Sequence, residues 1–303
     1  MNVRTFLRSI LVFSITFLFL PLTYALNNQV VQKSGEKERA QTILAQMRKA
    51  VFGEIKPDSV KGLSLIWDVS RSRANGEQDT GQFACDLLLP NKYFARDTED
   101  VSGNQGQFTI YKLLNGDQSW SDVQISGGEI PVVTEGGPPT ADDQAKQLQN
   151  IRREQALQLI RLALPPSPDF PLTYAFAGEA IAGDGQAYVI DVTGPGAFSA
   201  RLFIDKSSSR ILMMTYPEPG SRPISVYRGG AQGGQAPSPK DVTRNVVEVM
   251  YRFSEYRQVG GIMMPHFMTQ GSGGRISVEY KLKRFELNPS FAPDHFDSRK
   301  KRN

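Results

Sequence analysis

The chain has 303 residues and a formal net charge of +4, from 35 Lys or Arg residues and 31 Asp or Glu residues. Six of the cations lie at the two ends, Arg4 and Arg8 near the start and residues 299–302 at the finish, so the body between them carries a net charge of −2. A body without a clustered basic face excludes a nucleic-acid-binding protein, because that class places many cations against phosphates.

Residues 1–25 have the three parts of a secretory signal peptide. Arg4 and Arg8 form a positive segment, residues 10–20 are apolar, and Ala25 is a small residue suited to signal peptidase. The apolar run of about 11 residues is shorter than the roughly 20 that a spanning helix needs. We therefore expect a cleaved signal peptide at 1–25, with an uncleaved anchor as the alternative.

A helix is expected next, over residues 40–51. Apolar side chains recur there at helical spacing, and Gly53 follows as a stop. Such a helix must place its single apolar stripe against a dry surface. The stripe consists of Ala40, Ile43, Leu44, Met47 and Val51.

Four strands and a second helix follow in the first half of the chain. Asn75-Gly76 and Asn115-Gly116 are strong hairpin signals between strands. Thr140 and Asp143 have the spacing of a helix capping box, and Pro165-Pro166 ends that helix. The strands are expected at 62–70, 81–89, 92–97 and 106–113, and a loop rich in Gly and Pro at 127–139.

The second half alternates apolar and polar residues with a period of two, which predicts antiparallel strands with one dry face. The segment 228–239 interrupts them and is rich in Gly, Gln and Pro. It is either a flexible flap at the rim of the sheet or a disordered insertion. The expected strands are 171–178, 186–192, 198–205, 210–216, 245–256, 259–269 and 275–287.

The residues that carry common enzyme chemistry are scarce. With two histidines and Cys85 as the one cysteine, a zinc site of the usual Cys/His kinds is excluded, and no G-x-S-x-G motif occurs. Asp191 and Glu248 fall on the wet faces of their strands, where a carboxylate keeps its ordinary behaviour. Cys85 alternates in phase with apolar residues, so we expect a buried, inert thiol. We expect no enzyme, no catalytic residue, no metal and no cofactor.

A ligand-binding surface is the alternative to catalysis that the second half offers. Six of the eight methionines lie there, and thioethers suit surfaces that accept apolar partners of varied shape, although an ordinary core also holds methionine. Three tyrosines in phase with the apolar faces each need a partner for the hydroxyl group. The candidate lining residues are Tyr188, Ile190, Leu202, Met213, Val249, Tyr251, Phe253, Met263 and Tyr280.

The order of signal peptide, amphipathic helix, strands, central helix and second strand set resembles the LolA/LolB-like lipoprotein-carrier superfamily. Residues 251–256, the Gly260-Gly261 turn before Pro265, and the closing segment 285–289 resemble sequences of outer-membrane lipoprotein-sorting-like proteins. The resemblance implies an α+β, mainly β fold: an incomplete antiparallel β-barrel, or curved half-barrel sheet, covered by two or more helices. Its interior would bind acyl chains.

The expected organisation is a signal peptide at 1–25, a single half-barrel domain at 26–297 and a basic disordered tail at 298–303. The expected function is an exported carrier or binding protein, in the periplasm of a Gram-negative bacterium, that holds lipid or the acyl chains of lipoproteins. Its partners would be that cargo and membrane-associated donor and acceptor proteins. The alternative is a non-catalytic structural or interaction module of the cell envelope with a filled core.

Overall fold

The computed structural model describes residues 20–73, 75–100, 106–127, 140–182, 185–219 and 246–297, with side chains from residue 34 onward. The predicted loop at 228–239 and the predicted tail at 298–303 lie outside these residues, as do residues 1–19 and 128–139. The helices are α1 (Leu20–Phe52), a short 3-10 turn (Pro57–Ser59) and α2 (Ala141–Arg161). The strands are β1 (Gly62–Ser72), β2 (Gln78–Leu88), β3 (Lys92–Asp100), β4 (Gln107–Asn115), β5 (Gln118–Ser126), β6 (Thr173–Ala182), β7 (Gly185–Gly194), β8 (Phe198–Asp205), β9 (Ile211–Pro219), β10 (Val246–Val259), β11 (Ile262–Ser272) and β12 (Arg275–Leu287).

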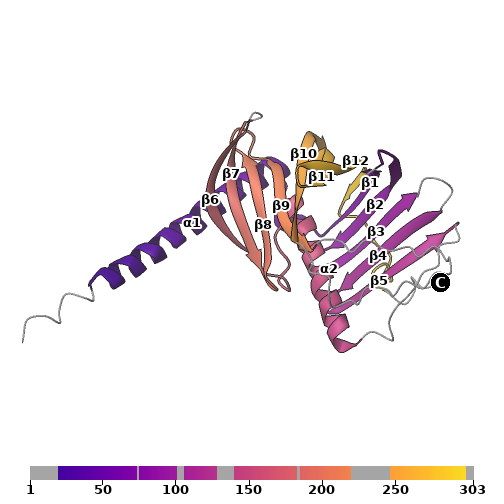
Figure 1. The fold of residues 1–303 in the computed structure, drawn as a ribbon, viewed down its shortest axis with the longest axis horizontal. Helices are drawn as coiled ribbons and strands as arrows, with labels where there is room; N and C mark the ends of the chain where they lie inside the picture. Colours follow the sequence, from indigo (N-terminus) through magenta and orange to yellow (C-terminus); the bar gives the residue numbers. More distant parts are fainter. Residues whose placement is uncertain are drawn as a thin grey trace, which may run out of the picture.

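All of these strands join one antiparallel sheet, in the order β5-β4-β3-β2-β1-β12-β11-β10-β9-β8-β7-β6 (Figure 1). The two strand sets meet where β1 pairs with β12, with Leu63 opposite Leu287 and Val69 opposite Tyr280. A sheet of this size with two ends that do not meet is an incomplete barrel. This confirms the predicted fold class of a mainly β, curved half-barrel covered by helices.

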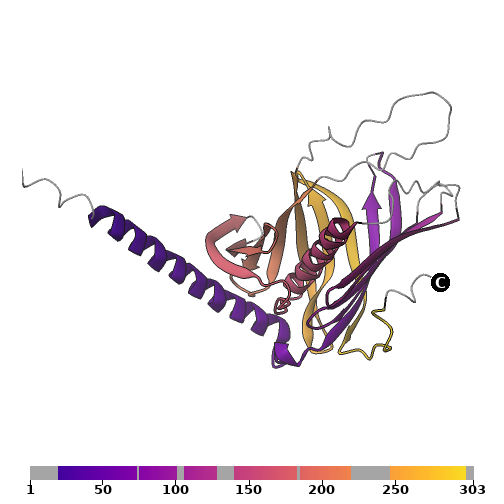
Figure 2. The same cartoon turned by 90° about the horizontal axis from the view of Figure 1, so that it is seen from below.

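The sheet bends into a deep trough that holds α2 (Figure 2). Its ladders shift register between Ile66 and Trp67, between Gln270 and Gly271, and again in β6 and β8. An extra residue on one strand increases local twist and bends that strand. The bulges therefore supply curvature that a flat ladder lacks, and they give the sheet an inner face toward α2 and an outer face.

Helix α2 begins as the sequence predicts. The Thr140 side chain accepts a hydrogen bond from the Asp143 backbone N–H, and the Asp143 carboxylate accepts one from the Thr140 N–H, which completes the capping box. One side of the helix packs into the main core through Ile151, Ala156, Leu159 and Ile160, each at most 3% exposed. The helix is thus fixed along the trough by its own apolar stripe.

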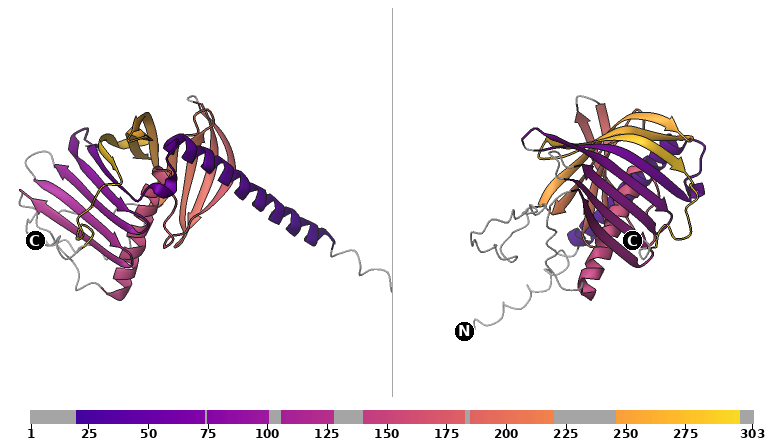
Figure 3. Two further views of the ribbon diagram at one scale, coloured as in Figure 1. Left: turned by 180° about the vertical axis from the view of Figure 1, so that it is seen from behind. Right: turned by 90° about the vertical axis from the view of Figure 1, so that its right-hand side faces the viewer.

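Helix α1 lies on the inner face at the other end of the sheet, against β6 and β11 (Figure 3). The predicted stripe from Ala40 to Val51 is buried, as the helical spacing requires. The helix begins at Leu20, well before residue 40, and includes the last residues of the predicted signal peptide. Extension costs little once a helix is nucleated, because each added residue gains one hydrogen bond. Across the described ranges, neither helix is both long and apolar enough to cross a membrane.

Strand β5 was missed by sequence alternation. It pairs with β4 through the predicted turn at Asn115-Gly116 and forms one edge of the sheet. Its inner face begins with Ser119 and Ser121 rather than with apolar residues. An edge strand needs only backbone pairing on one side, so its side chains carry a weak period-two signal.

The segment after β12 crosses the outer face. His295 is half-buried there, with Nε2 2.8 Å from Asp86 Oδ2. Its ring packs between Phe291, Phe94 and Phe296, and Phe296 is 4% exposed. This small outer core is formed by aromatic residues of β3 and of the segment after β12, which lie far apart in the sequence. The local pattern of polar and apolar residues therefore does not predict it.

The packing of α1 predicts that it contributes directly to stability. Leu44 is 1% exposed and lies in the main core, so Leu44→Ala should lower the free energy of unfolding by about 2–5 kcal/mol. Gln41→Ala, on the exposed side of the same helix, should change it by less than about 0.5 kcal/mol. Chemical denaturation of both variants measures this. Equal, small effects would show that α1 is only loosely attached.

Candidate functional site: an inner cavity beside helix α2

A cavity of about 500 Å³ remains between α2 and the inner face of the sheet. Its apolar and aromatic wall comes from both strand sets and from α2, so the cavity exists only because β1 and β12 join the two sets. That wall consists of Leu65, Trp67, Phe83, Tyr93, Leu157, Leu162, Tyr216, Tyr251, Phe253, Pro265, Met268 and Tyr280, and the polar lining of Asp97, Lys112, Asn150, Arg153, Glu154, Gln158, Arg161, Glu218 and Gln270.

Three tyrosines and a glutamine cross one side of the cavity on neighbouring strands. The rings of Tyr216 and Tyr251 stack with centroids 6.1 Å apart, and Tyr280 lies 6.1 Å beyond Tyr251. The hydroxyl groups of Tyr251 and Tyr280 both donate to Gln270 Oε1, at 2.7 and 2.8 Å. Burial raises the pKa of Tyr280 well above its ordinary value, and burial also raises that of Tyr216. The hydroxyl groups of Tyr280 and Tyr216 are therefore neutral hydrogen-bonding groups.

Three of the six charged residues that line the cavity, Asp97, Lys112 and Glu154, form ion pairs. Lys112 Nζ lies 2.6 Å from Glu154 Oε1, and Asp97 accepts a hydrogen bond from Arg71 on the neighbouring inner face. Arg71 also lies 3.4 Å from Glu99. Burial, which opposes the charged guanidinium, is outweighed by these carboxylates, so the pKa of Arg71 is raised. The pairs leave little net charge on this wall.

Two arginines on α2 differ from these pairs. Arg153 donates to the Pro217 carbonyl oxygen, a neutral acceptor, and lies near the Phe198 and Tyr216 rings. Arg161, the last residue of α2, places its guanidinium 3.7 Å from the centroid of the Tyr251 ring. The cavity thus combines an aliphatic and aromatic wall with a cationic end, which suits an amphipathic guest.

The thiol and the two imidazoles of the chain lie outside the cavity. Cys85 is 1% exposed and burial raises the pKa of its thiol, which confirms the buried thiol expected from the sequence. His266 is half-buried in β11, and His295 lies on the outer face, so neither lines the cavity. Within the described ranges, His, Cys, Asp and Glu side chains form no group of three able to hold a metal ion.

The fold of this chain is similar to that of a LolA superfamily protein. That structure, from Nitrosomonas europaea, is 9% identical and has a TM-score of 0.45, with 86% of this chain and 98% of that chain covered. A DUF1329 family protein from Desulfovibrio piger is 10% identical at a TM-score of 0.45, covering 88% and 98%. A domain named for outer membrane lipoprotein sorting, from Vibrio parahaemolyticus, is 8% identical at 0.45, covering 87% and 98%.

No protein-family model matches the chain, and no curated protein matches its sequence. The function proposed below rests on the residues of this chain.

The structure places the nine predicted lining residues in three groups. Tyr251, Phe253 and Tyr280 line the cavity. Ile190, Leu202 and Val249 also face inward, but they are at most 4% exposed and belong to the packed core.

The remaining three lie away from the cavity. Tyr188 is half-buried near α1, where Arg39 and Lys206 approach its ring. Met213 and Met263 are half-buried and alternate with the buried Met214 and Met264, so they lie toward the outer face.

The lining residues that sequence reasoning missed come from α2 and from the first strand set. The sequence carried a signal for them, because Glu154, Gln158 and Arg161 follow one another at helical spacing beside the buried stripe. In β1, Leu65 and Trp67 lie in phase with Leu63 and Val69, which are buried on the same face.

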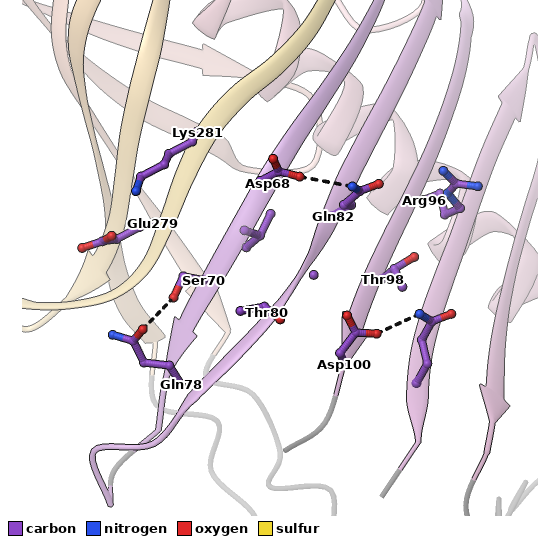
Figure 4. A pocket seen from close by; sticks show the side chains of 13 residues that line it. Asp68, Ser70, Gln78, Thr80, Gln82, Arg96, Thr98, Asp100, Glu279 and Lys281 are labelled. Atoms are coloured by element: carbon purple, nitrogen blue, oxygen red, sulfur yellow. Dashed lines mark hydrogen bonds between the residues drawn. The ribbon is translucent and has the colours of Figure 1, made fainter. Parts of the chain in front are cut away.

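A second, open depression of about 730 Å³ lies on the outer face of β12, β1, β2, β3 and β4 (Figure 4). Six of its polar side chains pair with one another: Gln82 donates to Asp68 at 3.1 Å, Ser70 to Gln78 at 3.3 Å, and Gln107 to Asp100 at 2.8 Å. Among its lining residues only Val69 has an apolar side chain, so the depression offers no wall for an apolar guest. The inner cavity is therefore the candidate site.

The buried tyrosines predict a loss of stability in alkali. Because the folded-state pKa of Tyr280 is raised above the unfolded value of about 10, its stabilising contribution is complete below that pH and falls as the pH rises further. Tyr280→Phe should cost about 1 kcal/mol near neutral pH, through the lost hydrogen bond to Gln270. Above about pH 10, the free energy of unfolding of this variant should also decline less steeply than that of the wild type. Urea unfolding across pH measures both, and parallel curves would contradict the prediction.

Proposed function

We propose that this protein is an exported carrier or binding protein that holds lipid, or the acyl chains of lipoproteins, in the inner cavity. The observation that carries the proposal is the cavity itself, because it persists although two helices and a large core fill much of the trough. Its volume falls within the range of about 300–1,000 Å³ that is typical of small-molecule sites. Binding, rather than catalysis, fits a lining of aromatic rings and paired charges.

The energy available from an apolar guest supports this function. Each methylene removed from water contributes about 0.8 kcal/mol, so a chain of about 14 carbons could contribute on the order of 10 kcal/mol. That gross value is large enough to offset a substantial part of the cost of immobilising the guest. Leu157, Phe253 and Met268 offer the apolar surface for such a chain.

The remaining parts of the proposal follow from the sequence. The signal-peptide pattern at 1–25 favours export to the periplasm of a Gram-negative bacterium, and residues 26–297 would act as one domain, with 298–303 as a tail. Membrane-associated donor and acceptor proteins would load and unload the cargo.

The second candidate is a structural or interaction module of the envelope. It is favoured by the end of the trough near β6–β9, where Ile190, Leu202 and Ile204 are at most 1% exposed and leave no room for a guest. If the cavity beside α2 held only water, this function would account for the fold.

Lipid carried by the purified protein distinguishes the two functions. Protein exported in a Gram-negative host should retain lipid in stoichiometric amounts, which organic extraction and mass spectrometry detect. An exported protein of similar size, purified in the same way, controls for adsorbed lipid. Extracts that repeatedly match this control would favour the structural module.

Two matched substitutions test whether the cavity is the place where cargo lies. Leu157→Phe adds volume toward the cavity, so it should reduce retained lipid and change the free energy of unfolding by less than about 1 kcal/mol. Leu202→Phe adds the same volume to a packed site, so it should cost about 1–3 kcal/mol and leave retained lipid per folded molecule unchanged. Lipid analysis and denaturation of both variants measure this. Unchanged lipid in Leu157→Phe would place the cargo elsewhere.

A further inference from the structure

Arg161 is a cavity residue whose charge the described part of the protein leaves without a carboxylate. Arg153 also lacks a carboxylate partner there, but it donates a hydrogen bond to the Pro217 carbonyl oxygen. The Nε atom of Arg161 is inaccessible to solvent and has no hydrogen-bond partner. Among the described residues, no carboxylate forms an ion pair with its guanidinium. Of the three cavity carboxylates, Glu154 and Asp97 are paired with Lys112 and Arg71, and Glu218 does not lie within ion-pair distance of Arg161.

The groups around Arg161 stabilise a cation only in part. The Tyr251 ring lies 3.7 Å from the guanidinium carbon, and the C-terminus of α2 carries a partial negative charge. Neither group is an oxyanion, and a guanidinium removed from bulk water is fully compensated only by an anion with good hydrogen-bond geometry. An arginine in this environment is ready to pair with an anion that enters the cavity.

The neighbouring polar groups favour the same kind of guest. Because both tyrosine hydroxyls donate to Gln270 Oε1, the amide NH₂ of Gln270 is the donor that this side chain has left to offer. One helical turn before Arg161, on the same face of α2, Leu157 belongs to the apolar wall. A single guest could therefore place an anionic head at Arg161 and an apolar chain along that wall.

We propose that Arg161 binds the anionic headgroup, a carboxylate or a phosphate, of an amphipathic lipid whose chain occupies the inner cavity. This inference rests on the proposed carrier function and adds the chemistry of the cargo. A guanidinium presents parallel N–H donors that match both oxyanions, so it discriminates a charged head from a neutral head of the same chain length.

The test compares three ligands at monomeric concentrations: palmitate, hexadecanol and palmitoyl lysophosphatidate. Displacement of an apolar fluorescent probe gives their dissociation constants for the wild-type protein and for Arg161→Gln, Arg161→Lys and Arg153→Gln. The wild type should bind palmitate about tenfold or more tightly than hexadecanol, because a hydrogen bond to a charged group contributes more than a neutral one. Arg161→Gln should abolish this preference, and Arg161→Lys should retain most of it.

Each outcome separates the inference from the proposed function. If hexadecanol and palmitate bind equally, or if Arg161→Gln weakens both alike, the headgroup role is overturned while lipid binding stands. An equal loss of the preference for palmitate in Arg153→Gln would also overturn the headgroup role of Arg161. The attraction would then come from the general positive charge of the cavity. If none of the ligands binds, both proposals fail.

The remaining comparisons complete the test. Should Arg161→Gln not fold, Arg161→Lys and the wild-type preference still decide the question. A stronger binding of lysophosphatidate than of palmitate would support the inference and identify the head as a phosphate, and the reverse order would support it with a carboxylate.

Discussion

The position of α2 inside the curved sheet is the constraint on which the rest of the structure depends. Its apolar stripe, including Ile151, Leu159 and Ile160, joins the core that also holds α1 and the inner faces of both strand sets. The helix prevents the trough from collapsing onto itself. Because a cylinder cannot fill a curved trough evenly, space remains along one flank of the helix, and that space is the cavity.

The trough itself depends on a pairing between distant parts of the chain. β1 and β12 are separated by about two hundred residues, yet Leu63 and Leu287 lie opposite each other in one ladder. Without that pairing the two strand sets would each lack a neighbour along one edge, and Trp67 and Tyr280 would not face the same cavity. Bulges at Ile66/Trp67 and Gln270/Gly271 bend the sheet on either side of this junction.

The interior has two ends with different physical roles. Near β6–β9 the inner face is close-packed, and α1 covers it, so this end supplies stability. Beside α2 the packing opens into a cavity with tyrosines, paired charges and Arg161. Separating these roles lets a protein keep a stable core while leaving a second region free to bind. The inner face of the sheet, formed by every second residue of each strand, supplies both the packed core and the cavity wall.

The sequence alone determined most of the helices and strands, and which side of each strand faces the core. Alternation identified eleven of the strands, Thr140 and Asp143 marked the start of α2, and the phase of Asp191 and Glu248 correctly placed them outside the core. Local rules suffice for these features because a strand's period and a helix cap depend on neighbouring residues. Only the tertiary structure decided that Tyr251 lines a cavity while Ile190 does not. Both residues face inward, and they differ in which helix, distant in the sequence, lies over them. Tertiary structure also decides the environment of Arg161, because Asp97 and Glu154 are already paired with Arg71 and Lys112.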